Sequence, residues 1–244
     1  MKSALRTIDV LEFLATRQPN PVRLPEISSA LGAPRSSMYA LLHTLASRGW
    51  VEIHDESYSL GIRVMIPSAS YIDSDPYVRV VRPVLAELSD TYGETFHMGR
   101  IDGDDVVYLI THESEGELRI FSRVGQRMAA SATGLGKAVL ALRPDLIPLH
   151  LQQRTPYSIT DPAVFKKEMD TTIKRGYATE DQENTIGLRC IAFALPYSSP
   201  VTDSISCSIP LAHWTEVHAS SVAAGMRRAV ARIVETAPRA HLEN

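Results

Sequence analysis

The chain has 244 residues, of which 44% are hydrophobic, 22% charged and 7% aromatic. These fractions are those of an ordinary globular protein, so they exclude a disordered or low-complexity chain. The longest uninterrupted apolar run, Cys190–Leu195, has six residues, whereas crossing a bilayer takes ~20. Lys and Arg number 25 against 28 Asp and Glu, so charge alone demands neither nucleic acid nor a membrane as partner. We expect a cytoplasmic protein without membrane contact.

Three helices and a hairpin are predicted in the first 60 residues. Apolar residues at helical spacing predict helices over residues 3–17, 24–32 and 35–48. Residues 50–53 and 58–60 flank a polar turn and predict a two-stranded hairpin. This order is the winged helix-turn-helix pattern. The same spacing also fits a small helical domain that binds nothing.

The third helix opens with polar residues that a core does not need. In helix-turn-helix proteins, the first turns of the recognition helix face base edges and phosphates. Serine hydroxyls suit phosphates, and Arg35 can bind a phosphate or a guanine. We therefore predict DNA contacts from Arg35, Ser36, Ser37, Tyr39 and His43.

The predicted DNA-binding segment is only weakly basic. Residues 1–50 carry six basic and three acidic side chains, a formal charge of +3. Phosphate contacts dominate affinity for DNA, so one such segment would bind poorly. We therefore expect a homodimer or homotetramer that sums its contacts on a palindromic operator of double-stranded DNA.

The remaining residues alternate predicted strands and helices. Residues 61–75 indicate a connector that can be helical as far as or through Pro67, and a further helix begins at Pro76 and ends at Gly93. Hairpin-joined strands with segregated helices indicate an α+β domain with a mostly antiparallel sheet. The predicted strands are 94–101, 105–112, 118–124, 189–196 and 203–210, and the predicted helices are 134–142, 144–152, 162–176 and a long C-terminal helix.

Four motifs, taken in order, carry a family resemblance. The first is the skeleton Leu24, Ile27, Leu31, Gly32, Pro34 and Ser36, and the second is Ala-Thr-Gly-Leu-Gly-Lys-Ala at 132–138. The third runs through Arg-Gly-Tyr-Ala at 175–178, Glu-Asp-Gln-Glu at 180–183 and Gly-Leu-Arg-Cys-Ile-Ala at 187–192, and the fourth is Ser-Cys-Ser-Ile-Pro at 206–210. On these residues the chain resembles the IclR family of bacterial transcriptional regulators, from about Leu5 to Val234.

The resemblance implies three segments and a site. They are a winged helix-turn-helix domain over 1–61, a linker helix over 62–76, and an effector-binding domain over 77–244 with a GAF-like α/β fold. It further implies dimers or tetramers that act as repressors or activators. By motif match, the effector site would use backbone N–H groups at Gly134 and Leu135, an acid at Glu180 or Asp181, and Cys190, Ser206 and Ser208. Many members carry a histidine where this chain has Ala129-Ala130-Ser131, so its ligand contacts are expected to differ there.

The chemistry of these residues fits a small organic acid. N–H groups at a helix start favour an anion, and Ser206 and Ser208, two apart on a strand, share one face. Glu180 or Asp181 assists a carboxylate only when protonated, and an acid there also suits a ligand hydroxyl or amine, or the backbone of its own loop. We expect apolar walls from Met98 and Phe121, with Phe96, Leu118 and Met128, and such walls favour an aromatic acid. The serines also fit an ordinary polar strand face, and Cys190 a small buried hydrophobe.

An enzyme acting on a small carboxylate, with Cys190 at its site, is the alternative. No histidine stands at a recognisable spacing from Cys190. Gly134–Lys137 is no phosphate loop, because Ser131 and Ala138 stand where that motif needs glycine and Ser or Thr. His, Cys and acidic residues are scattered singly, so we expect no metal, no cofactor and no catalytic residue.

Overall fold

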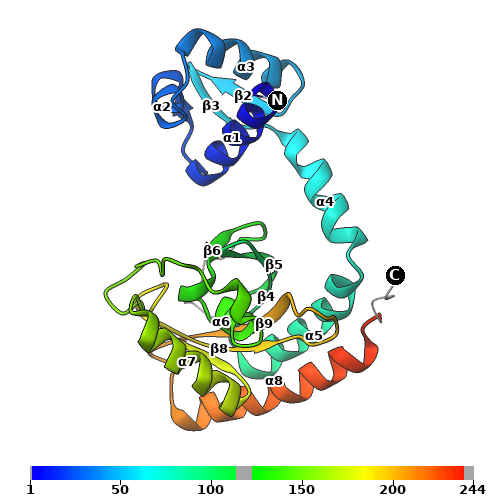
Figure 1. The fold of residues 1–244 in the computed structure, drawn as a ribbon. Helices are drawn as coiled ribbons and strands as arrows, with labels where there is room; N and C mark the ends of the chain where they lie inside the picture. Colours follow the sequence, from blue (N-terminus) through cyan, green and yellow to red (C-terminus); the bar gives the residue numbers. More distant parts are fainter. Residues whose placement is uncertain (1, 114–122, 239–244) are drawn as a thin grey trace. The chain divides into compact units, whose positions relative to one another are not determined.

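The computed structural model describes residues 2–113 and 123–238 of the chain (Figure 1). It divides the chain into two compact units, Met1–Ser74 and Asp75–Asn244. Each unit has its own core, and each is described in turn.

The N-terminal unit contains three helices, a small sheet and a linker helix. The helices are α1 (Lys2–Arg17), α2 (Leu24–Ala30) and α3 (Arg35–Ser47). Strands β1 (Val22–Arg23), β3 (Ser57–Leu60) and β2 (Val51–His54) form an antiparallel sheet in that order. The turn between β2 and β3 holds Asp55 and Glu56 at φ 48° and 61°, the geometry that matches the twist of a tight hairpin. A 3-10 turn, η1 (Ile62–Val64), and helix α4 (Met65–Ser74) follow.

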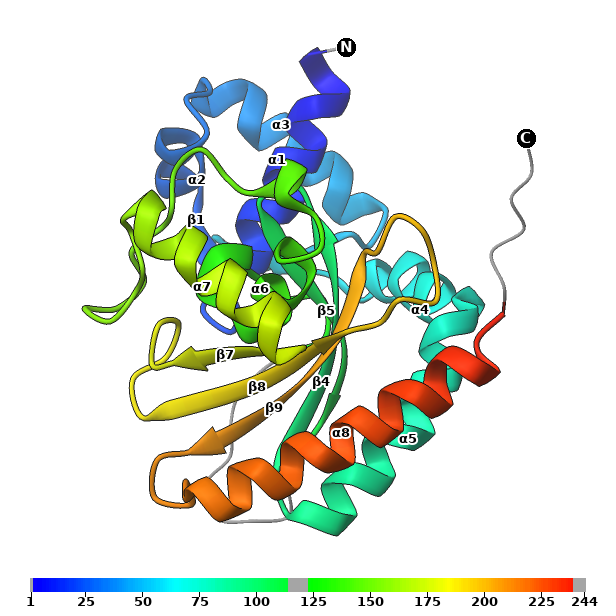
Figure 2. The same cartoon turned by 60° about the horizontal axis from the view of Figure 1, so that its bottom comes forward.

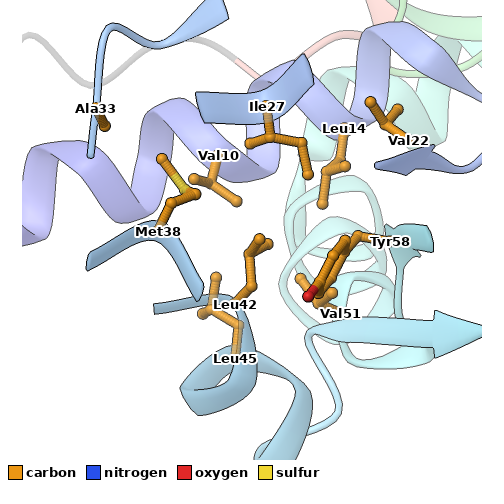
Figure 3. Close-up of a cluster of buried hydrophobic side chains, with 10 residues drawn as sticks. All are labelled: Val10, Leu14, Val22, Ile27, Ala33, Met38, Leu42, Leu45, Val51 and Tyr58. Carbon is orange, nitrogen blue, oxygen red and sulfur yellow. The ribbon is translucent and has the colours of Figure 1, made fainter. Parts of the chain in front are cut away.

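One apolar cluster holds the three helices against the sheet (Figure 3). Met38, Leu42 and Leu45 point inward from α3 because they recur every three or four residues along it. They meet Val10 and Leu14 of α1 and Ile27 of α2. The opposite face of α3 is thereby left to solvent.

The C-terminal unit is built on a six-stranded antiparallel sheet. The strand order is β6 (Arg127–Ala129), β5 (Asp105–His112), β4 (Thr95–Asp102), β9 (Asp203–Pro210), β8 (Leu188–Ala194) and β7 (Ala178–Asp181). Every pairing in this sheet is antiparallel. The unit therefore has the α+β architecture with a mostly antiparallel sheet that the sequence predicts.

Helices cover both faces of this sheet (Figure 2). The long helices α5 (Pro76–Tyr92) and α8 (Glu216–Thr236) pack on one face and on each other. Helices α6 (Gly134–Leu140) and α7 (Pro162–Arg175) lie over the other face, with the short turns η2 (Ala130–Ala132) and η3 (Pro144–Leu146). Strand residues alternate between these two faces, so register decides which side chains reach α6.

Helix ends follow the capping residues in the sequence. Asp75 accepts hydrogen bonds from the N–H groups of Tyr77 and Val78 at the start of α5, and Asp161 caps α7 in the same way. Gly93 and Gly176 adopt left-handed conformations at the ends of these helices. The bounds of both helices therefore match the prediction.

Some predicted elements are wrong or were missed. Residues 144–152 form only η3, because Pro148 holds Ile147 in an extended conformation (ψ 122°) that ends helical structure. Strands β1, β6 and β7 were not predicted. The strand predicted over 118–124 lies outside the described residues except for Arg123 and Val124, which are not in a strand.

No helix within residues 2–113 and 123–238 is both long and apolar enough to span a bilayer.

Candidate functional sites

The exposed face of α3 carries every residue predicted to contact DNA. Arg35, Ser36, Ser37, Tyr39 and His43 are all exposed. The Tyr39 and His43 rings lie 4.0 Å apart between centroids, and the Ser37 hydroxyl donates to the Pro34 carbonyl at 3.0 Å. Because the inward side of α3 is filled by the core, these polar groups are free to meet a ligand surface.

The C-terminal unit contains a cavity of about 520 Å³ between α6, the strands and the β7–β8 connection. This volume is typical of small-molecule sites. Six residues predicted for the effector site line it: Gly134, Leu135, Glu180, Cys190, Ser206 and Ser208. The other lining residues are Tyr108, Gln126, Met128, Thr133, Asn184, Thr185, Ile186, Gly187, Leu188 and Pro210.

Strand register brings the polar lining residues together. Cys190 lies opposite Ser208 on β9 and opposite Glu180 on β7. The Cys190 Sγ and Ser208 Oγ atoms are 3.4 Å apart. Ser206 and Ser208 project from the same face of β9, as their spacing predicts.

Helix α6 begins directly above these strands. Thr133 caps it by accepting a hydrogen bond from the Gly136 N–H at 3.1 Å, and the Leu135 carbonyl accepts one from Ser204 at 2.9 Å. A Cβ added to Gly134 would lie 3.2 Å from the Cys190 Cβ and 3.3 Å from the Ala192 Cβ. Glycine at 134 therefore allows the helix start to approach the strands closely.

Glu180 is the acidic group of the cavity. Its side chain is buried, and its Oε1 accepts a hydrogen bond from the Asn184 N–H at 3.0 Å. Burial raises the pKa of Glu180 to about 7, and this outweighs the lowering effects of the Asn184 and Cys190 hydrogen bonds. The neutral and charged forms are thus both accessible near neutral pH.

A buried ion pair joins α6 to the connection between β7 and β8. The Lys137 ammonium donates to Glu183 Oε1 and, at 3.4 Å, to the Thr179 carbonyl. Burial raises the pKa of Glu183, although Lys137 opposes that effect. Thr155 and Ser158 also hold the β7–β8 connection, because their hydroxyls donate to the carbonyls of Gln182 and Glu183 at 2.7 and 2.6 Å. Lys137 is therefore occupied by protein groups.

Cys190 has the environment of a structural thiol. Burial and the neighbouring Glu180 raise the pKa of the Cys190 thiol well above its ordinary value, whereas a nucleophilic cysteine needs a lowered pKa. Within the described residues, no histidine lines the cavity and no cluster of three His, Cys, Asp or Glu side chains could hold a metal ion.

Two of the predicted site residues that the structure describes do not line the cavity. Met98 pairs with Ile205 on the face that packs against α5 and α8, so its assignment to the pocket wall is corrected. Asp181 also points away from the cavity, and its carboxylate binds Arg189 at 2.8 Å. Phe121 lies outside the described residues, as does Leu118.

The wall residues that were missed come from the middle of β5, from strand ends and from connections. Tyr108 and Asn184 have no motif or periodicity that marks them, and their place depends on long-range pairing. Met128, one of the apolar residues considered for the wall, does line the cavity. A polar run before Gly187 was the only signal for Asn184 and Thr185.

The two units therefore define a DNA-binding transcriptional regulator with a separate ligand-binding domain. The model of the IclR helix-turn-helix domain matches residues 3–54, and that of the bacterial transcriptional regulator IclR C-terminal domain matches residues 69–235. The chain belongs to the IclR family. The resemblance seen in the sequence motifs is confirmed.

Relatives and solved structures agree with this assignment. The HTH-type transcriptional regulator BhcR of Paracoccus denitrificans (strain Pd 1222) is 32% identical over 77% of this chain and 69% of its own length. The transcriptional repressor IclR of Escherichia coli (strain K12) is 28% identical over 88% and 82%. The crystal structure of Thermotoga maritima IclR superposes with a TM-score of 0.73 at 25% identity, covering 96% of this chain and 98% of that one.

A further structure similar in fold contains a ligand. It is an IclR homologue from Microbacterium hydrocarbonoxydans complexed with 4-hydroxybenzoate, with a TM-score of 0.76 at 18% identity over 96% of this chain and 98% of that one. At this identity the similarity shows the fold alone.

Proposed function

We propose that this regulator acts in the cytoplasm as a homodimer or homotetramer on a palindromic operator, and that a small organic acid in the C-terminal cavity sets its affinity for that operator. An aromatic acid is favoured. The observation that carries the proposal is the cavity itself, because it joins neutral hydrogen-bond donors to apolar walls.

The DNA contacts are assigned to Arg35, Ser36, Ser37, Tyr39 and His43 on the exposed face of α3. Recognition helices present such residues to the major groove. Two copies are needed, because the unit is only weakly basic. Apolar side chains that a lone unit leaves exposed support association: Leu5 and Ile8 on α1, and Met65 and Ile66 on α4, are each more than half exposed.

The effector contacts are assigned to the helix start at Gly134 and Leu135 and to Ser206 and Ser208, with Cys190 beside them. These groups donate hydrogen bonds without carrying charge. The side chains of Met128, Leu188 and Tyr108 line the cavity and offer apolar contacts to the body of the ligand. The 4-hydroxybenzoate bound by the Microbacterium homologue supports an acid of this shape.

Strand β9 offers a route from the cavity to the linker over residues 62–76. Ser206 and Ser208 lie on the same strand as Asp203, which Arg100 joins to Asp75 at the start of α5. A ligand that binds two arrangements of this strand with different affinity would shift the linker and hence the spacing of the recognition helices.

The DNA assignment is tested by selecting operator duplexes from a random pool and then comparing variants. We expect Arg35→Ala to weaken operator binding by about 1–3 kcal/mol, the value of one bidentate contact to guanine. Arg82→Ala, which removes an exposed arginine from α5, should leave binding unchanged. Equal operator affinity of the two variants would show that Arg35 and the exposed face of α3 do not contact the operator.

The effector assignment is tested by thermal shift with a panel of small carboxylates and phenolic acids, 4-hydroxybenzoate included. Ser206→Ala should weaken binding of the acid by about 1–3 kcal/mol, because the substitution removes a hydrogen bond to a desolvated charge. Ser221→Ala, an exposed serine on α8, is the matched control. Failure of every acid to stabilise the protein or to alter operator binding would refute the proposed effector class.

A further inference from the structure

The cavity poses an electrostatic problem for an acid ligand. Glu180 is the one carboxyl among its described lining residues, and none of those residues is Lys, Arg or His. Two ionised carboxylates about 4 Å apart repel by about 4 kcal/mol at the effective dielectric of a protein surface, and by more in the interior. An ionised Glu180 would thus oppose the ligand proposed above.

Glu180 stands beside the groups that would hold that ligand. The Cβ position of Gly134, at the start of α6, is 3.9 Å from the Glu180 Cβ. Cys190, the neighbour of Ser208, lies opposite Glu180 across the β7–β8 pair. A carboxylate bound by the helix start and the serines therefore meets the Glu180 side chain.

Within residues 2–113 and 123–238, the elements around Glu180 supply no free cation to its side chain. Lys137 of α6 lowers the pKa of Glu180, but its ammonium is bound by Glu183, whose own charge raises that pKa. On β4, burial lowers the pKa of His97 to about 3, so the imidazole next to Tyr108 is neutral. Burial likewise keeps the Tyr108 hydroxyl of β5 and the Cys190 thiol of β8 protonated.

We propose that the Glu180 side chain is a neutral carboxylic acid when it recognises the effector. Its O–H then donates to a carboxylate oxygen of the ligand. The ligand therefore binds together with one proton, which comes from solvent whenever Glu180 is ionised in the free protein. Apart from the O–H bond that Glu180 gains when it takes up this proton, no covalent bond forms or breaks. The proton stays between the two carboxyl groups, a geometry that gives strong charge-assisted hydrogen bonds. The inference rests on the proposed acid effector and specifies how the site tells an acid from an amine.

Calorimetric titration of the full-length protein with 4-hydroxybenzoate tests this proposal. With the pKa of Glu180 at about 7, the affinity should be roughly tenfold weaker at pH 8 than at pH 6, because the protonated fraction falls by that factor. The binding heat at pH 8 should vary with the ionisation enthalpy of the buffer in the sense of proton uptake. 4-Hydroxybenzamide should bind without either effect.

Two variants separate the role of Glu180 from a general effect of pH. Glu180→Gln keeps a neutral donor of similar size, so 4-hydroxybenzoate should bind it equally at pH 6 and pH 8 without proton uptake. Asp181→Asn changes the neighbouring acid, which points away from the cavity, and should behave like the wild type. If Glu180→Gln does not fold, the proposal is decided by the wild-type protein alone, through the dependence of its binding heat on the buffer.

The outcomes distinguish this inference from the proposed function. Binding of 4-hydroxybenzoate with equal affinity at both pH values and no proton uptake would overturn the role of Glu180 and leave the acid effector standing. Persistence of the pH dependence in Glu180→Gln would also overturn it, as would tighter binding of 4-hydroxybenzylamine than of the acid. Absence of binding by 4-hydroxybenzoate and by every other acid of the panel would refute both proposals.

Discussion

Arg100 forms an ion pair with Asp75, the residue that caps α5 and begins the C-terminal unit, with 2.5 Å between Nη1 and Oδ2. The same guanidinium holds Asp203 through two bonds of 2.7 and 2.6 Å. Asp203 is fully buried on β9, and the Tyr197 hydroxyl also donates to it. One arginine thus joins the start of α5 to the strand that carries Ser206 and Ser208.

Replacing Arg100 with methionine should strongly destabilise the C-terminal unit. The variant leaves two buried carboxylates without their cation, a change that costs about 3–5 kcal/mol. Arg127→Met is the matched control, since Arg127 is half exposed and its pairs with Asp102 and Asp105 are worth about 0–1 kcal/mol. Urea unfolding measures the stability of both variants. Equal losses of unfolding free energy would show that the pairs of Arg100 with Asp75 and Asp203 do not stabilise the unit more than an exposed pair does.

The N-terminal unit was predictable because its signals are local. The inward residues of α3, Met38, Leu42 and Leu45, show helical spacing in the sequence, and the polar turn at 54–57 separates the two wing strands. Gly134, Ser206 and Ser208 were identified by motif, and strand alternation correctly placed both serines on one face.

The rest of the pocket depends on pairing that no local pattern shows. Choosing between Glu180 and Asp181 required strand β7, which was not predicted, and its register with Cys190. Met98 has the right chemistry for a pocket wall, but it lies on the other face of the sheet. The register shift between Met98 and Gly99 then sets where Tyr108 lies, and a single sequence gives no sign of such a bulge.

Lys137 and Glu183 should depend on each other for stability. Lys137→Met leaves the Glu183 carboxylate buried without its cation and should lower the free energy of unfolding by about 3–5 kcal/mol. The double variant that combines Lys137→Met with Glu183→Gln should lose less free energy of unfolding than Lys137→Met alone, because it leaves no buried charge from this pair. Lys166→Met removes an exposed pair with Asp170 and should change little. A double variant less stable than Lys137→Met in urea would contradict this coupling.

Glu180 should make the free protein less stable as the pH rises from about 5 to 8. Its pKa is raised from 4.5 to about 7 in the folded state, so the folded protein binds more protons than the unfolded chain in this window. Stability therefore falls with pH, by up to about 3 kcal/mol for this group alone. The same sign holds for Glu94 and Glu183, whose pKa values burial also raises.

The contribution of Glu180 is isolated by comparing Glu180→Gln with wild type at each pH. The variant should gain stability relative to wild type between pH 5 and pH 8, as measured by urea unfolding. Asp181→Asn should show no such trend, since the Arg189 guanidinium lowers the pKa of Asp181 and its effect lies below pH 4. A pH-independent difference between Glu180→Gln and wild type would contradict the raised pKa.

Two glycines of α6 should respond differently to alanine. A Cβ at Gly136 would lie 2.1 Å from the Ala130 carbonyl oxygen, whereas a Cβ at Gly134 would meet side-chain atoms, those of Cys190 and Ala192 at 3.2 and 3.3 Å and that of Glu180 at 3.9 Å. Backbone cannot yield as a side chain can, so Gly136→Ala should cost more than the ~1–3 kcal/mol typical of overpacking. Gly134→Ala should cost less than Gly136→Ala but narrow the cavity at the helix start, weakening 4-hydroxybenzoate binding. Thermal unfolding and calorimetry of both variants check this order, and a stable Gly136→Ala protein would show that α6 does not press against η2.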